Sequence, residues 1–171
     1  DQMIEDILAY SRAQMRPLKP VRTEVRPLVQ QVVSEFEPQL RDGVELEQDV
    51  EAGVLKCDRE GLIQILRNFL SNALKFSRAQ TPPRIRIEGR WRGRDYRFAV
   101  SDNGVGFDMR YHDRIFEIFH RLPSVAGQSG TGIGLALTAR AAERLGGRVW
   151  AESAPGQGAT FFFELTGGMQ A

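Results

Sequence analysis

The sequence predicts an α/β fold in which a mixed, mostly antiparallel sheet packs on three helices as a two-layer sandwich. Three observations support this prediction. Apolar residues recur at helical spacing in three segments of the main domain, and they alternate with polar residues in several shorter segments. The chain has 171 residues, enough for one domain with its own core. A sheet of this kind buries one face against helices.

Composition excludes several other classes of protein. With 42% hydrophobic and 26% charged residues, the chain is expected to be globular rather than disordered. A net charge of +1 gives no support for bulk binding to nucleic acid. We find no transmembrane-length apolar run and no signal peptide, so we expect no membrane contact. Cys57 is the single cysteine, which rules out an internal disulfide and fits a cytoplasmic location.

A first helix is predicted from Gln2 to Gln14, where Ile4, Ile7 and Leu8 recur at helical spacing. Two prolines, at 17 and 20, then interrupt the pattern, because each removes a hydrogen-bond donor and restricts the residue before it. The chain starts inside this helical pattern, so we expect a fragment of a longer protein. The predicted division is a helix end at 1–15, a linker at 16–21, a folded domain at 22–166 and a tail at 167–171.

The first half of the domain contains two predicted helices and two short strands. One helix is expected from Val25 to Leu40, with Pro27 in its first turn. Strand candidates follow at Val44–Glu47 and Val54–Leu55. The strongest helical pattern runs from Asp58, a capping residue, to Phe76.

The second half supplies the remaining strands and the last helix. Alternation predicts a hairpin of Arg84–Glu88 and Tyr96–Ser101. A helix is expected over Ile133–Leu145, and two glycines end it. Strands at Val149–Ala151 and Ala159–Leu165 complete an antiparallel pair.

Two glycine clusters indicate a ligand site. The first is Asp102-Asn103-Gly104-Val105-Gly106-Phe107, and the second is Gly130-Thr131-Gly132-Ile133-Gly134-Leu135. Glycine lets the backbone approach a ligand, and the second cluster leads into a helix whose N-terminus can bind phosphate. The pattern predicts a nucleotide site under a movable lid, formed by residues 108–129. The glycine spacing fits neither a P-loop nor a dinucleotide fingerprint.

A polar strip accompanies the strongest helix. Asn68, Asn72 and Lys75 are spaced four and three residues apart, so they share one narrow surface beside the apolar stripe. An ordinary solvated helix face would more often mix Glu, Lys and Arg. The strip is therefore a second candidate part of the nucleotide site.

Four segments in this order resemble the N, G1, F and G2 boxes of sensor histidine kinases: Asn68–Phe76, Asp102–Phe107, Ile115–Phe119 and Gly130–Leu135. The resemblance covers about residues 20–165 and implies the catalytic ATP-binding domain of such a kinase. The implied fold is the Bergerat-type ATP-binding fold shared with DNA gyrase, the ninety-kilodalton heat-shock chaperones and mismatch-repair ATPases. Residues 3–12 resemble the end of the second dimerisation helix, and residues 115–122 and 150–165 resemble bacterial phytochrome-type kinases.

The resemblance assigns roles to residues near ATP. Asp102 would accept a hydrogen bond from the exocyclic amine of adenine, although on local sequence alone it reads as a turn aspartate. Asn72 would offer its amide oxygen to Mg²⁺, which prefers oxygen ligands. Lys75 would pair with phosphate. Phe76 stands where the family often has Tyr and would pack near the nucleotide without donating a phenolic hydrogen bond.

Asn68 carries a mechanistic prediction. In the gyrase and chaperone branch, a Glu four residues before the metal-binding Asn activates water. A neutral amide cannot act as a general base at ordinary pH. We therefore expect ATP to be held without fast hydrolysis and its γ-phosphoryl kept for an external nucleophile.

The lid and the strand after it supply the remaining candidates. Gly104 and Gly106 would form the first hinge of the lid, and the second cluster would place the phosphate contacts of Gly130, Thr131, Gly132, Ile133, Gly134 and Leu135 at a helix start. Arg121 would reach the γ-phosphate, with an exposed loop arginine as an equal alternative. Thr160 would lie near adenine, or it is a plain strand residue. His112 and His120 are interpreted as surface or packing residues of the lid.

The implied function is phosphoryl transfer from Mg-ATP to a histidine on the protein's own upstream dimerisation helix, and then to the receiver domain of a response regulator. The longer protein would be a homodimer. Three alternatives remain. These are a nucleotide-sensing module without kinase activity, a serine kinase of the anti-sigma type, and a gyrase-like ATPase, which Asn68 disfavours.

Overall fold

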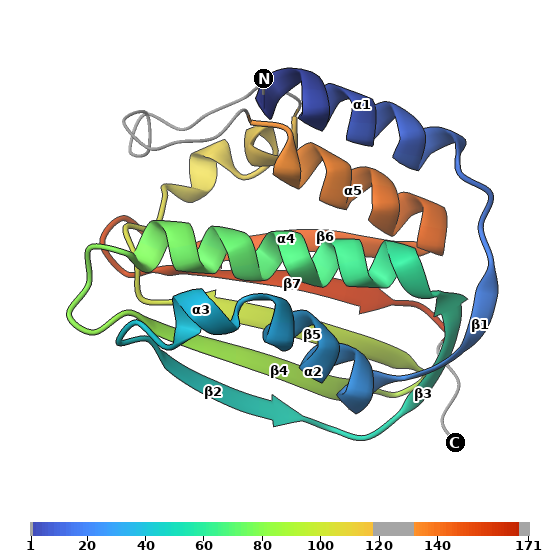
Figure 1. Cartoon of the computed structure of the whole chain (residues 1–171), viewed down its shortest axis with the longest axis horizontal. Coiled ribbons are helices and arrows are strands. Elements are labelled where there is room, and N and C mark those ends of the chain that lie inside the picture. Colours follow the sequence, from blue (N-terminus) through green and yellow to red (C-terminus); the bar gives the residue numbers. More distant parts are fainter. Residues whose placement is uncertain (1, 118–131, 168–171) are drawn as a thin grey trace.

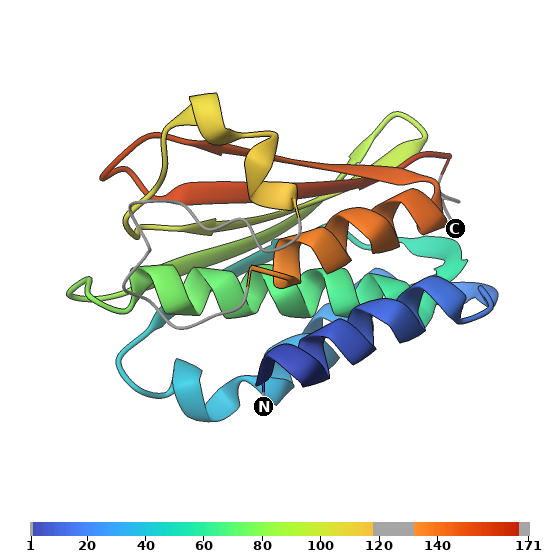
Figure 2. The same ribbon diagram turned by 90° about the horizontal axis from the view of Figure 1, so that it is seen from above.

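The computed structural model describes residues 2–117 and 132–167 of the chain. A five-stranded sheet carries a layer of helices on one face (Figures 1 and 2). The elements in chain order are α1 (Gln2–Met15), β1 (Pro20–Glu24), α2 (Val25–Glu35), α3 (Glu37–Leu40), β2 (Glu45–Val50), β3 (Val54–Asp58), α4 (Arg59–Ser77), β4 (Arg84–Arg92), β5 (Asp95–Asp102), the 3₁₀ turns η1 (Met109–Tyr111) and η2 (Arg114–Phe116), α5 (Gly134–Leu145), β6 (Gly147–Ser153) and β7 (Ala159–Leu165).

The sheet has the order β2-β4-β5-β7-β6 and confirms the predicted fold class. Strands β2 and β4 are parallel, whereas the other three neighbouring pairs are antiparallel. Helices α2, α4 and α5 cover one face, and α1 lies outside this layer, alongside α5 (Figures 1 and 2). A separate ribbon pairs β1 with β3.

Helix α4 lies at the centre of the helical layer, between α2 and α5, and packs on the sheet (Figure 1). Phe69 is fully buried, and its ring centroid lies 5.6 Å from that of Phe161 on β7. Burying a large apolar side chain of this kind contributes about 2–3 kcal/mol. This burial fixes which face of α4 points away from the sheet and toward α5.

Two predicted helix ends are confirmed. Asp58 caps α4, because its Oδ2 accepts a hydrogen bond from the N–H of Gly61 at 2.9 Å. Gly146 ends α5 in the left-handed conformation, with φ of 77°. None of the described helices is long and apolar enough to span a membrane.

Two elements differ from the sequence-based expectation. The helix expected over residues 25–40 breaks at Phe36, because Pro38 cannot donate a backbone hydrogen bond. Pro38 lies instead in the first turn of the short α3, which begins at Glu37. Strand β1 begins at Pro20, inside the predicted linker, and pairs antiparallel with β3. Strand β1 has only five residues, and its sequence shows no clear alternation of apolar and polar residues that would have predicted it.

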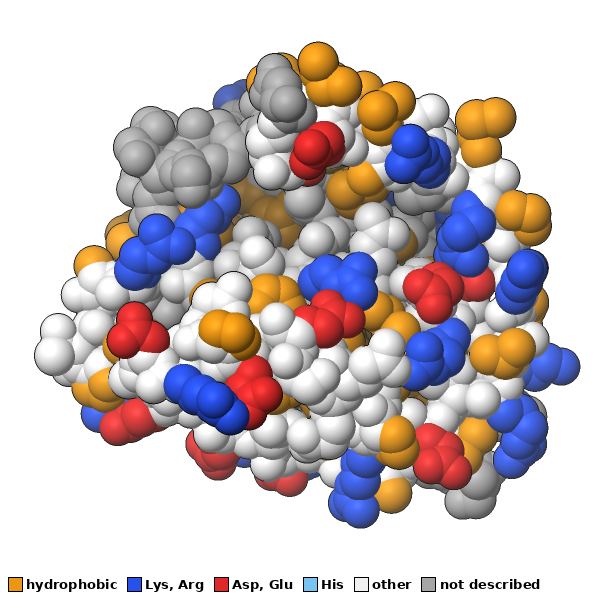
Figure 3. Space-filling view, in the orientation of Figure 1, with side chains coloured by type: hydrophobic (Ala, Val, Ile, Leu, Met, Phe, Trp, Pro, Cys, Tyr) orange, Lys and Arg blue, Asp and Glu red, His pale blue; other side chains and the backbone are white. Residues whose placement is uncertain are grey.

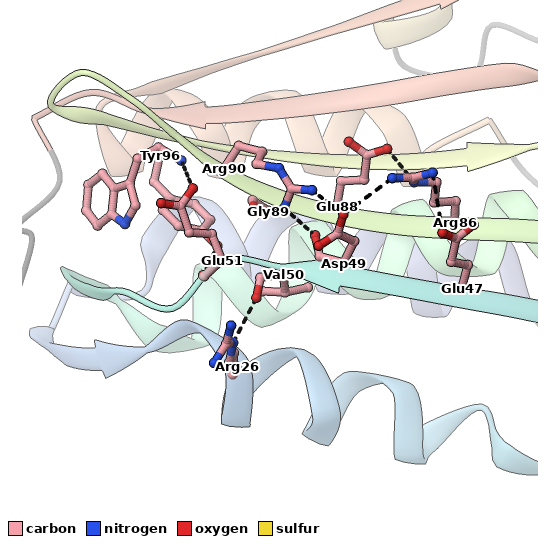
Figure 4. A network of polar contacts seen from close by, with 11 residues as sticks. Arg26, Glu47, Asp49, Val50, Glu51, Arg86, Glu88, Gly89, Arg90 and Tyr96 are labelled. Carbon is pink, nitrogen blue, oxygen red and sulfur yellow. Dashed lines mark hydrogen bonds and ion pairs between the residues drawn. The ribbon is translucent and has the colours of Figure 1, made fainter.

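The face of the sheet opposite the helices carries a lattice of paired charges (Figure 4). Arg86 on β4 lies within ion-pair distance of Glu47 and Asp49 on β2 and of Glu88 on its own strand. Arg90 also pairs with Asp49. Such exposed pairs contribute little stability individually, about 0–1 kcal/mol. They neutralise this face rather than giving it one sign of charge.

Candidate nucleotide site

Asp102 is the last residue of β5 and lies at the rim of the sheet. Its Oδ1 accepts a hydrogen bond from the N–H of Gly104 at 2.8 Å. Its Oδ2 is buried and has no hydrogen-bond partner among the described residues. Burial raises the pKa of Asp102 to about 6, although the N–H groups of Gly104 and Ala159 act to lower it. A buried acceptor without a donor fits a ligand that brings one.

The loop after Asp102 is pressed against the C-terminal part of α4. The N–H of Val105 donates to the backbone oxygen of Phe76 at 3.3 Å. A Cβ on Gly104 would lie 2.2 Å from that same oxygen, so only glycine fits there. Gly106 has φ of 64°, which other residues rarely adopt. The structure thus brings Asp102, Gly104 and Phe76 together.

The polar strip of α4 reaches α5 through Asn68. Its Nδ2 lies 3.1 Å from the backbone oxygen of Gly134 and 3.2 Å from Oγ1 of Thr138. Asn72 and Lys75 follow on the same side of α4, half-buried, and the Lys75 Nζ lies 5.0 Å from the ring centroid of Phe76. Because Phe76 contacts the loop of Asp102 and Asn68 contacts α5, helix α4 joins both glycine-containing segments.

The described part of the second glycine cluster leads into α5. Gly132 has φ of 78°, and Ile133 is fully buried at the N-cap position. A Cβ on Gly134 would meet nothing within 4 Å, and Leu135 is half-buried. Three predicted contacts, Arg121, Gly130 and Thr131, lie outside the described residues, as does His120.

Thr160 is a correction to the sequence-based prediction. In the pairing of β5 with β7, Ala159 lies opposite Asp102, and Thr160 lies opposite Ser101. The hydroxyls of Thr160 and Ser101 are 2.9 Å apart. Because side chains alternate along a strand, Thr160 lies on the other face of the sheet from the Asp102 carboxylate. The alternative, a plain strand residue, describes it correctly.

His112 packs the start of the lid against the sheet edge, as expected for a packing residue. Its Nε2 accepts a hydrogen bond from the N–H of Ala151 on β6 at 3.0 Å, and its ring lies edge-on to Phe116 at 5.8 Å. Because Nε2 accepts, the ring proton of neutral His112 is on Nδ1, 3.2 Å from Oδ1 of Asp113. The hydrogen bond from Ala151 to His112 holds the segment that follows Gly106 against β6.

The donor set beside α4 fits magnesium held together with a nucleotide. The described residues contain no group of three or more His, Cys, Asp or Glu side chains that could hold a metal by themselves. Mg²⁺ is usually bound through one or two protein oxygens, with phosphate oxygens and waters completing its shell. The half-buried amides of Asn72 and Asn68 can supply such oxygens.

Sequence reasoning missed two residues of this site. Thr138 hydrogen-bonds Asn68, and Ala159 lies beside Asp102. Thr138 could have been found from its place one helical turn after Gly134. Ala159 carries no polar group, so nothing in its chemistry indicated a site.

Comparisons with known proteins find a matching family model and similar relatives. Residues 57–167 match the family model described as histidine kinase-, DNA gyrase B- and HSP90-like ATPase. The phytochrome-like protein Cph1 of Synechocystis sp. is 34% identical over 164 residues, covering 95% of this chain and 22% of that protein. The sensor histidine kinase AruS of Pseudomonas aeruginosa is 34% identical over 175 residues, covering 95% and 17%. The chain thus spans about a fifth of the length of these relatives.

Solved structures agree as well. Full-length ShkA in complex with AMPPNP superimposes with a TM-score of 0.83 at 29% identity, covering 99% of this chain and 36% of that one. The histidine kinase ThkA in complex with response regulator protein TrrA gives a TM-score of 0.77 at 21% identity, covering 96% and 46%. The second likeness shows the fold alone.

Proposed function

We propose a function from the premise that this chain belongs to the histidine kinase-, DNA gyrase B- and HSP90-like ATPase family, whose model matches residues 57–167. The chain carries a histidine kinase ATPase domain, and curated relatives include sensor histidine kinases. In the proposal, the domain binds Mg-ATP and donates the γ-phosphoryl to a histidine on an upstream dimerisation helix of a homodimeric protein. The phosphoryl group then passes to a response regulator.

The observation that carries the proposal is the buried, unpartnered Oδ2 of Asp102. An exocyclic amine of adenine donates a hydrogen bond, whereas guanine presents a carbonyl at the corresponding position. The carboxylate therefore favours adenine. Because the loop after Asp102 contacts Phe76, the proposal puts the base near the C-terminal end of α4. In the proposal, Asn72, Lys75 and the start of α5 then contact the metal and phosphates.

When bound, Mg²⁺ would neutralise phosphate charge in the transfer. Asn72 would hold it through the amide oxygen, and Lys75 would pair with a phosphate oxygen. Asn68 is neutral and cannot remove a proton from water, so in this proposal an external nucleophile attacks the γ-phosphoryl. Arg121 remains a candidate contact for the γ-phosphate.

Phosphoryl transfer in trans tests this proposal. The described chain is mixed with the histidine-bearing helical segment of its parent protein and γ-labelled ATP. We expect label on the segment and none on this chain, with slow phosphate release when the segment is omitted. Rapid ATP hydrolysis without labelling of the segment would overturn the kinase assignment and favour a gyrase-like ATPase.

A further inference from the structure

Thr138 forms a closed set of hydrogen bonds with the site, although it lies one helical turn inside α5. Its side chain is fully buried. Its Oγ1 lies 3.0 Å from the backbone oxygen of Gly134 and 3.2 Å from Nδ2 of Asn68. Nδ2 of Asn68 also lies 3.1 Å from the same Gly134 oxygen. These three groups link the middle of α4 to the first turn of α5.

The chemistry of the three groups fixes the Asn68 amide in one orientation. A carbonyl oxygen can only accept, so Thr138 gives its single hydroxyl proton to Gly134 and accepts from the Asn68 amide. Nδ2 has two protons and supplies both remaining bonds. Rotating the amide by half a turn would set Oδ1 of Asn68 against the Gly134 oxygen, which puts two acceptors together. Oδ1 is therefore the atom that Asn68 offers to a ligand.

We propose that Thr138 is a positioning residue for the nucleotide site, and that it holds Asn68 with Oδ1 available to accept a hydrogen bond from water bound to Mg²⁺. Asn72 lies one turn further along α4 on the same strip, so a metal held by Asn72 would have its water shell within reach of Asn68. This inference rests on the proposed function, because it assigns a task to Asn68 only where Mg-ATP binds.

Thr138 and its variants separate hydrogen bonding from packing. Thr138→Val keeps the branched shape of the buried side chain but removes the hydroxyl, so Asn68 loses one of its two acceptors. Thr138→Ser keeps the hydroxyl and removes one methyl group, and is the matched control. Circular dichroism and the midpoint of thermal unfolding establish that both variants fold.

Two measurements test the proposal. The first is solvent exchange of the Asn68 side-chain NH₂ protons, followed by NMR without nucleotide. We expect slow exchange in the parent and Thr138→Ser, and about fivefold faster exchange in Thr138→Val, as for loss of one net hydrogen bond. The second is titration with a non-hydrolysable ATP analogue. We expect Thr138→Val to bind it about fivefold more weakly with Mg²⁺ present and unchanged without Mg²⁺.

The outcomes distinguish this inference from the proposed function. If Thr138→Val loses the same affinity for the ATP analogue with and without Mg²⁺, or if Thr138→Val and Thr138→Ser give equal results in both measurements, Thr138 only packs. Either result would overturn this inference and leave the proposed function standing. If Thr138→Val does not fold, the parent and Thr138→Ser still test the inference. Rapid exchange of the Asn68 NH₂ protons in the parent would overturn the inference. Slow exchange, together with the parent's Mg²⁺ dependence of analogue binding in Thr138→Ser, would support it. A parent chain that binds no nucleotide would overturn the proposed function and this inference with it.

Discussion

At a single residue, Asp102, a structural cost accompanies the proposed binding role. Its pKa is raised to about 6 by burial, and its Oδ2 has no donor among the described residues. In the nucleotide-free domain, ionisation of this carboxylate therefore opposes folding at neutral pH. The same unpaired oxygen can accept an amine of the ligand. A group that weakens the empty domain is then stabilised when the nucleotide binds.

This cost predicts an unusual pH dependence of stability. Because the pKa in the folded state lies above the ordinary value of 3.8, the folded state binds more protons than the unfolded state between about pH 6 and 4. The contribution of Asp102 to the free energy of unfolding should rise by about 1 kcal/mol as pH falls from 7 to 5. Urea denaturation at both pH values, with Asp102→Asn beside the parent, measures it.

Asp95→Asn is the matched control, because Asp95 lies at the opposite end of β5, where its Oδ1 accepts from the N–H of Gly167 at 2.9 Å. The Asp95 variant should keep the rise between pH 7 and 5, and the Asp102 variant should lose it. A rise of the same size in all three proteins would assign the effect to other groups.

The sequence indicated the chemical type of a candidate side chain more readily than the direction in which that side chain points. Asp102, Asn68 and Asn72 were proposed from residue type, spacing and the resemblance to histidine kinases, and they stay predictions. Thr160 was misplaced because the face of a strand residue depends on strand register, and a shift by one residue reverses it. Thr138 was missed because its partner, Asn68, lies 70 residues away in sequence.

The attachment of α1 is the main feature at the scale of elements. Arg16, just after α1, forms an ion pair with Asp58, the buried cap of α4, and Arg144 of α5 donates to the backbone oxygen of Arg16. Burial would raise the pKa of Asp58, but Arg16 and the N–H groups of Lys19 and Gly61 hold it at about 2. These contacts join the end of α1 to both helices of the site.

Most of α1 itself is weakly held. It exposes the large apolar side chains of Met3, Ile4, Ile7, Leu8 and Met15. Figure 3 shows hydrophobic side chains along the upper margin of the molecule, where Figure 1 places α1. The hydrogen bonds at Arg16 and the contact with α5 are therefore what order the helix in this chain.

Arg16→Gln should release α1 without unfolding the domain. Losing a charged hydrogen-bonded pair removes about 1.5–3 kcal/mol of interaction, so amide hydrogen exchange of residues 2–15 should be about tenfold faster or more. Arg12→Gln removes an exposed arginine of α1 and is the control. Exchange in Arg16→Gln that equals exchange in Arg12→Gln would show that Arg16 does not hold the helix.

Element boundaries followed local signals where those signals were strong. The Asp58 cap and the Gly146 end of α5 were predicted correctly, because both depend on a single residue type. The break at Phe36 and the strand β1 were not predicted. Strand β1 is formed by pairing with β3, more than 30 residues further along the chain, and tertiary pairing of this kind leaves little trace in local periodicity.

Within residues 2–117 and 132–167, helices α2, α4 and α5 cover one face of the five-stranded sheet, and paired charges line strands β2 and β4 on the other face. Positive and negative side chains are interspersed on the face that Figure 3 shows, in agreement with the net charge of +1. The two glycine-containing segments meet opposite ends of the α4 strip, through Phe76 and Asn68. The fold therefore brings together, along one helix, the residues for which we propose base, metal and phosphate contacts.

Isothermal titration calorimetry tests whether Asp102 recognises the adenine of a bound Mg-ATP. The parent, Asp102→Asn and Asp95→Asn are titrated at pH 7.5 with ATP and with GTP, each with and without Mg²⁺. We predict that the parent and Asp95→Asn bind Mg-ATP in preference to Mg-GTP, and that Asp102→Asn binds Mg-ATP about tenfold more weakly or worse, as for loss of a hydrogen bond to a charged group. Unchanged ATP affinity in Asp102→Asn, with no preference for ATP over GTP in the parent, would contradict the account.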